Sequence, residues 1–364
     1  MNVLYIVGNR PQFVKLAVLH EEVKKHPFIR ESVIHTGQHF SKEMSDVFFE
    51  ELAIELPIVN LCIHSVSALA MIGRTIEALE LEVTKQNPDI IVVFGDTNAT
   101  LAGAIVAKKL AIPLFHVEAG IRTYEEDMPE ESNRYIADRL ADVNFCCTSL
   151  GVDNLHKEGY NIRNKVINSG DLMLDAYHHY YDRFIQRSKY FSHLPELQGD
   201  YLVFTIHRKR NTTDNGILKN IIYALNEINK EISVICPLHP NTKNQIVTNK
   251  LQCEFTTIPP VSYLDMQYLI HNSVYVITDS GGIQREAFFA QKPTLILMEN
   301  PFWPEVIEHG CAINCTGEKQ EILKSFHELK KKERAFNPAI FGDGHAARII
   351  TKTMIEFAAS SVNK

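Results

Sequence analysis

The feature that most constrains the fold of this chain is a repeated pattern of short apolar runs, each followed by a glycine or a polar residue and then by an amphipathic stretch. In the first half these runs are Val3–Val7, Ile90–Phe94 and Pro113–Val117. Such runs predict buried strands, whereas Leu101–Leu110 and Arg134–Leu140 carry apolar residues at helical spacing. The alternation indicates parallel sheets with crossover helices.

The same pattern returns in the second half, after a lapse over the aromatic and charged stretch Tyr177–Phe191. Its runs are Tyr201–Ile206, Ser233–Cys236, Val274–Thr278 and Thr294–Met298. A chain of 364 residues also fits two α/β domains better than one. We therefore predict an α/β fold with two Rossmann-like domains. The first comprises 1–175 and a C-terminal helix at 345–364, and the second comprises 176–344.

Composition excludes some classes of partner and site. The formal net charge of −7 gives no basic excess for a nucleic-acid partner. The N-terminal apolar run is too short for a signal peptide and no run is long enough to span a membrane, so we expect a cytoplasmic protein without a membrane partner. The seven cysteines lack zinc-site spacing, which predicts buried free thiols and no metal.

Charged and glycine residues follow the first predicted strand, where ligands of open parallel sheets bind. Gly8-Asn9-Arg10-Pro11 opens a helix, and Lys15 lies one turn further. A helix N-terminus with two added cations favours a pyrophosphate or carboxylate. A structural cap or ion pair is the alternative interpretation of Arg10.

Three carboxylates, Asp96, Glu118 and Glu130, are predicted at this same edge of the first sheet. Glu118 ends an apolar strand, where a carboxylate is costly unless it is paired or functional. Clustering and burial push carboxylate pKa values toward neutrality, which suits proton transfer. The alternatives are an N-cap role for Asp96, a helix-dipole role for Glu130, and magnesium binding.

The second half places polar residues after its own strands. His207 and His239 end successive predicted strands, and Ser280-Gly281-Gly282 begins a helix after a third. Glycines at a helix start allow backbone N–H groups to approach a phosphate closely. Glu286 lies one turn further, where it can accept hydrogen bonds from ribose hydroxyls.

With these residues in view, the chain resembles the non-hydrolysing UDP-N-acetylglucosamine 2-epimerase family over nearly its whole length. The motifs that carry the resemblance are, in order, GNRPQFVK, GDTNATLAGA, HVEAGIRT with PEESNR, HRKRN, PLHPN, TDSGGIQREA and GDGHAARI.

The resemblance implies a GT-B fold, with UDP held mainly by the C-terminal domain, and a homodimer. It implies a UDP-sugar substrate and inversion of C2 by elimination and re-addition of UDP, for surface polysaccharide precursors, without a cofactor. By motif position, the catalytic residues are Asp96, Glu118, Glu130 and His207. The UDP-binding residues are Arg10, Lys15, His239, Ser280, Gly281, Gly282 and Glu286.

Several positions depart from the family pattern. Gln12 replaces an acidic residue, Arg210 and Arg285 each replace a glutamate, and the 298–305 loop and the 36–44 segment also differ. These departures resemble the branch that acts on UDP-2,3-diacetamido-2,3-dideoxy-glucuronate. Lys209, Arg210 and Arg285 suit a sugar carboxylate, or are solvated surface charges.

UDP-N-acetylglucosamine remains the alternative substrate. Rival functions are a hydrolysing 2-epimerase that releases UDP, a GT-B glycosyltransferase, and a nucleotide-binding module without catalysis.

Overall fold

The computed structural model describes residues 1–37, 51–52, 54, 58–64, 66–125, 128–160, 165–191, 193–332, 334 and 336–362. Most of the segment 36–44, singled out in the sequence, lies outside these residues. The chain divides into two compact units, Met1–His178 with Ala339–Lys364, and His179–Pro338. None of the described helices combines the length and the apolar character needed to cross a bilayer.

The first unit contains, within the described residues, a parallel seven-stranded sheet in the order β3-β2-β1-β4-β5-β6-β7. The strands are β1 (Asn2–Val7), β2 (Arg30–His35), β3 (Ile58–Asn60), β4 (Ile90–Phe94), β5 (Leu114–Ala119), β6 (Val143–Cys146) and β7 (Lys165–Asn168). The central strands are apolar on both faces because helices cover both sides.

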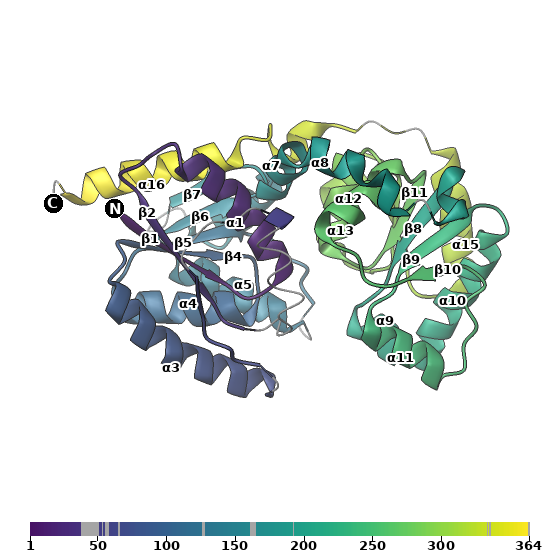
Figure 1. Cartoon of the computed structure of the whole chain (residues 1–364), viewed down its shortest axis with the longest axis horizontal. Coiled ribbons are helices and arrows are strands. Elements are labelled where there is room, and N and C mark those ends of the chain that lie inside the picture. Colours follow the sequence, from purple (N-terminus) through teal and green to yellow (C-terminus); the bar gives the residue numbers. More distant parts are fainter. Residues whose placement is uncertain are drawn as a thin grey trace. The chain divides into compact units, whose positions relative to one another are not determined.

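The helices of this unit form two layers (Figure 1). They are α1 (Arg10–Val23), α3 (Ala68–Gln86), α4 (Asn98–Lys109), α5 (Pro129–Leu140), α6 (Ser149–Lys157), α7 (Leu172–His179) and α16 (Ala346–Val362), with the short η4 (Pro338–Phe341). The C-terminal α16 packs beside α1 on one face of the sheet, and α3 and α4 pack together on the other.

The second unit repeats this architecture with the order β10-β9-β8-β11-β12-β13, again all parallel among the described strands. Its elements are α8 (Tyr181–Ile185), η2 (Gln186–Phe191), η3 (Pro195–Gln198), β8 (Tyr201–Thr205), α9 (Lys209–Thr213), α10 (Asn215–Asn229), β9 (Ser233–Pro237), α11 (Pro240–Thr248), β10 (Thr256–Ile258), α12 (Tyr263–Asn272), β11 (Tyr275–Thr278), α13 (Gly281–Phe289), β12 (Thr294–Ile296), α14 (Pro304–Glu308), β13 (Ala312–Asn314) and α15 (Lys319–Lys331). The predicted α/β class and its parallel sheets are confirmed.

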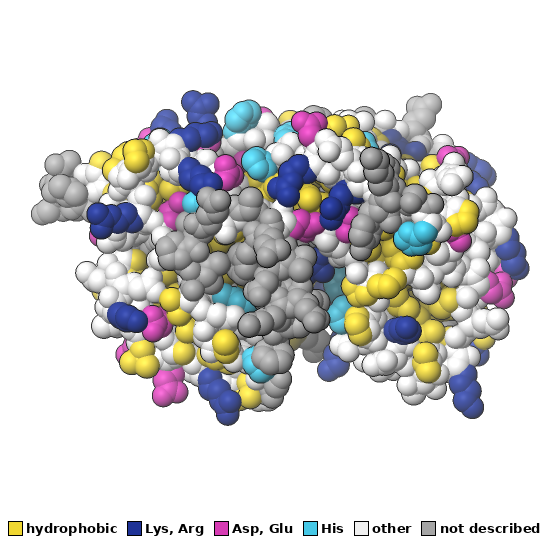
Figure 2. All heavy atoms as spheres, in the orientation of Figure 1, with side chains coloured by type: hydrophobic (Ala, Val, Ile, Leu, Met, Phe, Trp, Pro, Cys, Tyr) yellow, Lys and Arg dark blue, Asp and Glu magenta, His cyan; other side chains and the backbone are white. Residues whose placement is uncertain are grey.

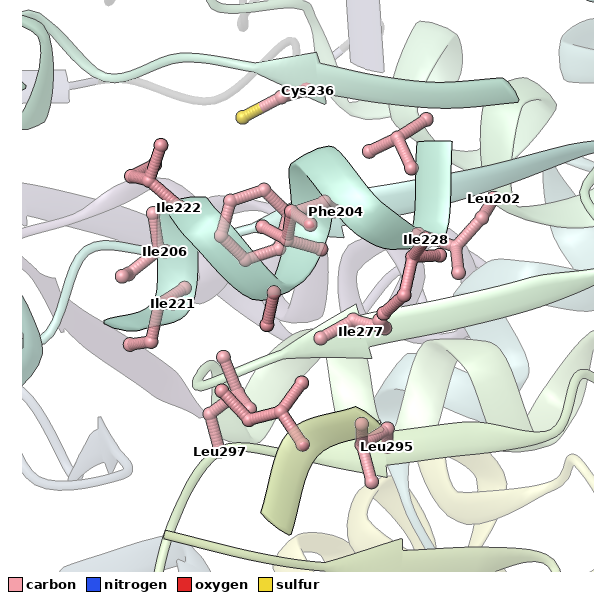
Figure 3. Packing of buried hydrophobic residues seen from close by; sticks show 14 of the residues in the cluster. Leu202, Phe204, Ile206, Ile221, Ile222, Ile228, Cys236, Ile277, Leu295 and Leu297 are labelled. Carbon is pink, nitrogen blue, oxygen red and sulfur yellow. The ribbon is translucent and has the colours of Figure 1, made fainter. Parts of the chain in front are cut away.

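The core of the second unit lies between its sheet and α10 (Figure 3). Phe204 of β8 and Ile222 of α10 belong to this cluster, which continues through Ile277 of β11 to Leu295 of β12, and all four residues are fully buried. Alternate residues of neighbouring strands point to this layer, since side chains on a strand alternate between faces.

Five of the seven cysteines are buried, as predicted, but Cys62 is exposed and that part of the prediction is wrong. Cys62 has a φ of 54° and donates its N–H to the side chain of Asn60. This left-handed turn directs the residue away from the core, which an apolar sequence context does not reveal.

Asp175 ties the C-terminal helix to the first unit. Its two carboxylate oxygens accept N–H hydrogen bonds from Ala346 and Ala347, at 3.1 and 2.8 Å, and so cap α16. Burial, assisted by the charge of Asp171, raises the pKa of Asp175 to about 6 despite these bonds. The folded protein therefore holds this proton more tightly than the unfolded chain does.

We expect Asp175→Asn to remove a pH dependence of stability. The stability due to the raised pKa is present below about pH 4 and is lost as the pH rises through about 6. Between these limits the free energy of unfolding of the variant should rise, relative to wild type, by up to about 3 kcal/mol. Urea unfolding across this range measures it, with exposed Asp182→Asn as control. If the free energy of unfolding changed with pH in the same way in Asp175→Asn and in wild type, the assignment of the raised pKa to Asp175 would be wrong.

Candidate active site

Two loops of the first unit meet where its strand order reverses. β1 and β4 are neighbours, and their following loops carry Gly8-Asn9 and Gly95-Asp96. Such a switch point leaves a crevice at the carboxyl ends of the strands. Gln12 joins the loops, accepting the Gly8 N–H at 2.6 Å and donating to the Phe94 carbonyl at 2.5 Å. An ionised glutamate has no donor for the second bond, which explains the departure at this position.

Glu118 is held in an unusual backbone conformation at the end of β5. Its φ is 69°, and the register with β6 shifts between Val117 and Ala119. Such a bulge re-aims a side chain, and strained backbone of this kind concentrates at functional sites. The carboxylate forms an ion pair with Lys15 of α1, whose side chain is 3% exposed. Gly95 has a φ of 61°, which favours glycine, and a Cβ there would be in ordinary contact with Glu118 Oε1, at 3.6 Å.

Arg134 of α5 gathers the neighbouring carboxylates. It pairs with Asp96 and, at 2.6 Å, with Glu131, and its side chain is almost completely buried. Burial alone lowers the pKa of Arg134, but the charges of Asp96, Glu131 and Glu118 outweigh burial and raise it. The structure thus brings Lys15, Glu118 and Asp96 to one edge.

Glu130 and Glu131 at the start of α5 have different environments. Glu131 is buried and accepts hydrogen bonds from the backbone of Thr123 and Tyr124 at 3.1 and 3.0 Å. Glu130 is exposed. The catalytic role assigned to Glu130 remains a prediction.

Buried charged side chains form a network next to β5. His116 lies 2.7 Å from both Asp138 Oδ1 and the Gly95 carbonyl oxygen. Arg122 pairs with Asp138 and with Glu158, each at 2.8 Å. Burial opposes ionisation of Asp138, but His116 and Arg122 together lower its pKa. The network contacts Gly95 and Gly120, on either side of Glu118. His116 and Arg122 lie in the motif HVEAGIRT, but their partners Asp138 and Glu158 lie outside the motifs, and the sequence did not indicate this role.

Two further polar residues that sequence reasoning missed lie beside Glu118. A carboxylate oxygen of Asp171, the Cys147 sulfur and a carboxylate oxygen of Glu118 all lie within 4.8 Å of one another. Cys147 and Asp171 are buried. We call these three residues the Glu118 cluster. Gly170-Asp171 after β7 repeats the Gly95-Asp96 pattern after β4, and this was the available sequence signal.

The second unit has its own switch point, between β8 and β11. Asp279, fully buried after β11, accepts the N–H groups of His207 and Arg208 at 3.1 and 2.9 Å. Its carboxylate also lies 3.1 Å from His207 Nδ1. Burial would lower the pKa of His207, but the hydrogen bond and charge of Asp279 raise it. Asp279 therefore orients the half-exposed imidazole, a role that was not foreseen.

The helix start predicted to bind phosphate is shaped by an aromatic ring. Ser280 caps α13 by accepting the Ile283 N–H at 3.5 Å. A Cβ at Gly281 would lie 2.6 Å from the Phe302 ring, so only glycine fits there. A Cβ at Gly282 would meet nothing closer than 3.7 Å, which leaves space over the helix N-terminus.

The other predicted residues of this unit lie on neighbouring elements. Glu286 accepts a hydrogen bond at 2.7 Å from Gln267, and both residues are buried. His239 caps α11, and burial together with the charge of His207 lowers its pKa.

The remaining predicted UDP-binding residue, Arg10, belongs to the first unit. It begins α1 and is half-buried.

The basic residues considered for a sugar carboxylate differ in their surroundings. Arg210 pairs with Glu299 at 2.6 Å, and buried Arg285 lies 5.2 Å over the ring of Trp303. Lys209 is exposed. Two of the three cations thus already have intramolecular partners. On the face drawn in Figure 2, lysine and arginine side chains lie among acidic ones.

The two Rossmann-type units and their strand-end loops define an isomerase of the UDP-sugar 2-epimerase class, with the predicted GT-B fold. The chain belongs to the UDP-N-acetylglucosamine 2-epimerase family, whose model matches residues 21–355.

Two relatives illustrate this membership. The chain is 38% identical to UDP-2,3-diacetamido-2,3-dideoxy-D-glucuronate 2-epimerase of Pseudomonas aeruginosa, covering 97% of this chain and 99% of the relative. It resembles the crystal structure of Methanocaldococcus jannaschii UDP-GlcNAc 2-epimerase in complex with UDP-GlcNAc and UDP, with a TM-score of 0.87 and 33% identity. That match covers 98% of this chain and 100% of the other.

Proposed function

We propose that this protein inverts C2 of a UDP-linked 2-acetamido sugar by eliminating UDP and adding it back after reprotonation on the opposite face. The observation that carries the proposal is Glu118 at the end of β5, whose backbone has a positive φ and whose carboxylate pairs with buried Lys15. Removal of a weakly acidic C2 proton needs a placed base, and departure of UDP needs charge stabilisation.

The predicted residues take separate roles in this reaction. Glu118, Asp96 and Glu130 exchange protons with the sugar, and His207 acts on the leaving group or the sugar. The phosphates bind at Ser280, Gly281 and Gly282, where the N-terminus of α13 supplies N–H groups and positive potential. Arg10, Lys15 and His239 add charge or hydrogen bonds to the diphosphate, and Glu286 accepts hydrogen bonds from the ribose.

The two glycines at the start of α13 give a matched pair of variants. Gly281→Ala should destabilise the protein by about 1–3 kcal/mol, because its methyl group meets the Phe302 ring. Gly282→Ala should leave stability unchanged but weaken UDP binding about tenfold, because its methyl group enters the open space. Urea unfolding and calorimetric titration with UDP measure the two effects. Equal UDP affinity of Gly282→Ala and wild type would place UDP elsewhere.

The experiment that tests the reaction is incubation in heavy water with UDP-N-acetylglucosamine or with UDP-2,3-diacetamido-2,3-dideoxy-glucuronate, followed by NMR at C2. The proposal predicts deuterium at C2 and an inverted product from one of these sugars. No deuterium with either substrate would refute the epimerase proposal for both. The 38% identity to the Pseudomonas aeruginosa relative supports testing the diacetamido sugar first.

The same incubation separates the rival functions. A hydrolysing enzyme would release UDP in proportion to the substrate consumed. A glycosyltransferase would need an acceptor, and a binding module would bind UDP without any C2 exchange.

We further propose a cytoplasmic homodimer that makes precursors for surface polysaccharide. Family membership supports this assignment. Light scattering during size-exclusion chromatography tests the dimer, and a mass corresponding to one 41.4 kDa chain would contradict it.

A further inference from the structure

Gln267 is a fully buried amide in the middle of α12, and its bond to Glu286 is not used in the proposed reaction. Its Nε2 donates to Glu286 Oε2 at 2.7 Å. The reverse placement of the amide would set its oxygen against the carboxylate, where two acceptors would repel each other. The amide therefore has one defined orientation, with its N–H group on Glu286.

The oxygen of the Gln267 side chain gains little from this position. Among the described residues, no donor lies within hydrogen-bond distance of its buried Oε1. A buried acceptor without a donor lowers stability, so an apolar side chain of similar size would suit this place in α12 better. The bond to Glu286 is therefore the contact that an apolar residue could not replace.

The carboxylate of Glu286 faces two directions. Its Oε2 faces Gln267 of α12, which packs against α13 (Figure 1). Its Oε1 lies toward the start of α13, since a Cβ at Gly282 would be 3.8 Å from it and 3.7 Å from Ser280 Oγ. Gly282 and Glu286 are four residues apart and so share one face of the helix. Oε1 thus lies on the side where the phosphates of UDP are proposed to bind.

The chemistry of Gln267 suits a carboxylate that has to accept hydroxyl groups. An arginine or lysine at this position would neutralise Glu286, whereas a neutral amide donates a hydrogen bond and leaves the negative charge in place. A charged acceptor binds hydroxyl donors about twice as strongly as a neutral one. It also repels phosphate, so the diphosphate stays at Gly281 and Gly282 and the ribose lies one turn further along α13.

We propose that Gln267 is a positioning residue of the nucleotide site, which holds Glu286 turned toward the ribose hydroxyls and so makes the protein select ribonucleotides over deoxyribonucleotides. The inference deepens the proposed UDP site, on which it rests. Gln267 acts through Glu286 and does not need to contact the nucleotide.

The test measures the binding of UDP, 2′-deoxy-UDP and 3′-deoxy-UDP to the whole chain by calorimetric titration. Wild type should bind UDP about 10–100-fold more tightly than at least one deoxy analogue, because a hydroxyl bonded to a charged group is lost. Gln267→Met keeps the size of the side chain and removes the donor. It should reduce the preference for UDP about tenfold, by weakening UDP binding and leaving the binding of that analogue within about twofold of the wild-type value.

Two further variants separate positioning from a structural role. Gln284→Met makes the same change at a second buried glutamine, whose Nε2 lies 3.3 Å from Met298 Sδ, and should alter all three affinities by one common factor. Glu286→Gln should lose most of the preference by itself, and adding Gln267→Met to it should change the preference no further. A Gln267→Met protein that keeps the wild-type preference would overturn the positioning role, and so would additive effects in the double variant.

The failure of this inference and the failure of the proposed function give different results. If wild type exchanges no deuterium at C2, the epimerase function fails, whereas the deoxy analogues still test the ribose contact. If wild type does not bind UDP, or binds UDP and both analogues equally, Glu286 does not accept ribose hydroxyls and the role of Gln267 is overturned.

A crystal structure of wild type with UDP tests the same contact if Gln267→Met does not fold. Gln267 Nε2 should remain bonded to Glu286, with the other carboxylate oxygen within about 3.2 Å of a ribose hydroxyl. A ribose that lies away from Glu286, or a Gln267 amide that turns to contact the nucleotide itself, would overturn the proposal.

Discussion

Glu118→Gln is expected to reduce deuterium incorporation at C2 by about 10²–10⁴-fold while UDP binding is retained. The amide has the size of the carboxylate and can still accept a hydrogen bond from Lys15, so the end of β5 should keep its shape. It cannot accept the C2 proton, because an amide oxygen is far less basic than a carboxylate. UDP binding is expected to persist because the UDP contacts assigned to the second unit are untouched.

NMR at C2 in heavy water and calorimetric titration with UDP measure the two halves of this prediction. Glu77→Gln on α3 is the matched control, since Glu77 is exposed and undergoes the same chemical change. Full exchange activity in Glu118→Gln would remove this carboxylate from the mechanism. Loss of UDP binding together with exchange would indicate that Glu118 organises the site and does not act as the base.

The second large effect is expected on stability, from Asp138→Asn. Asp138, His116 and Arg122 have fully buried side chains, and the carboxylate lies 2.7 Å from His116 Nδ1 and 2.8 Å from Arg122 Nη1. Removing one partner of a buried charge network leaves the others without compensation, which costs about 3–5 kcal/mol. C2 exchange should also fall, since His116 contacts the Gly95 carbonyl oxygen beside Glu118.

Glu158→Gln provides the comparison for that variant. Glu158 contacts Arg122 as well, but its side chain is 26% exposed. The free energy of unfolding of Glu158→Gln should therefore fall by only about 1 kcal/mol. Because the pKa of Asp138 is lowered by folding, its contribution is present above about pH 4 and is lost as the pH falls through the lowered value. Urea unfolding at neutral and acidic pH measures both variants. If Asp138→Asn and Glu158→Gln lost similar free energies of unfolding, burial would not determine how much each carboxylate contributes to stability.

The strands were predictable because periodicity is a local property. Val3–Val7 and Ile90–Phe94 are buried strands, and the apolar pattern after them marks helices. The C-terminal helix was also predicted, and it packs beside α1. The exposure of Cys62 was missed, because a left-handed turn leaves no apolar or polar periodicity to detect.

The sheet edge proposed to be catalytic was only partly predictable from the sequence. Asp96 and Glu118 stand out as polar residues at the ends of apolar runs, so a sheet-edge site follows from the sequence. Arg134 was not recognised as the partner of Asp96, since 38 residues separate them. Asp279 was quoted in its motif, but its contact with His207 spans 72 residues.

The sequence by itself therefore determined which residues end the strands, because hydrophobic periodicity and helix signals act over a few neighbouring residues. Only the tertiary structure decided which charges meet. Strand order places β4, β5, β6 and β7 side by side, so Glu118 lies within reach of Cys147 and Asp171. The ion pair joins Glu118, at the irregular end of β5, to Lys15 of α1. Electrostatic interactions depend on distance and burial, and the folded chain alone sets both.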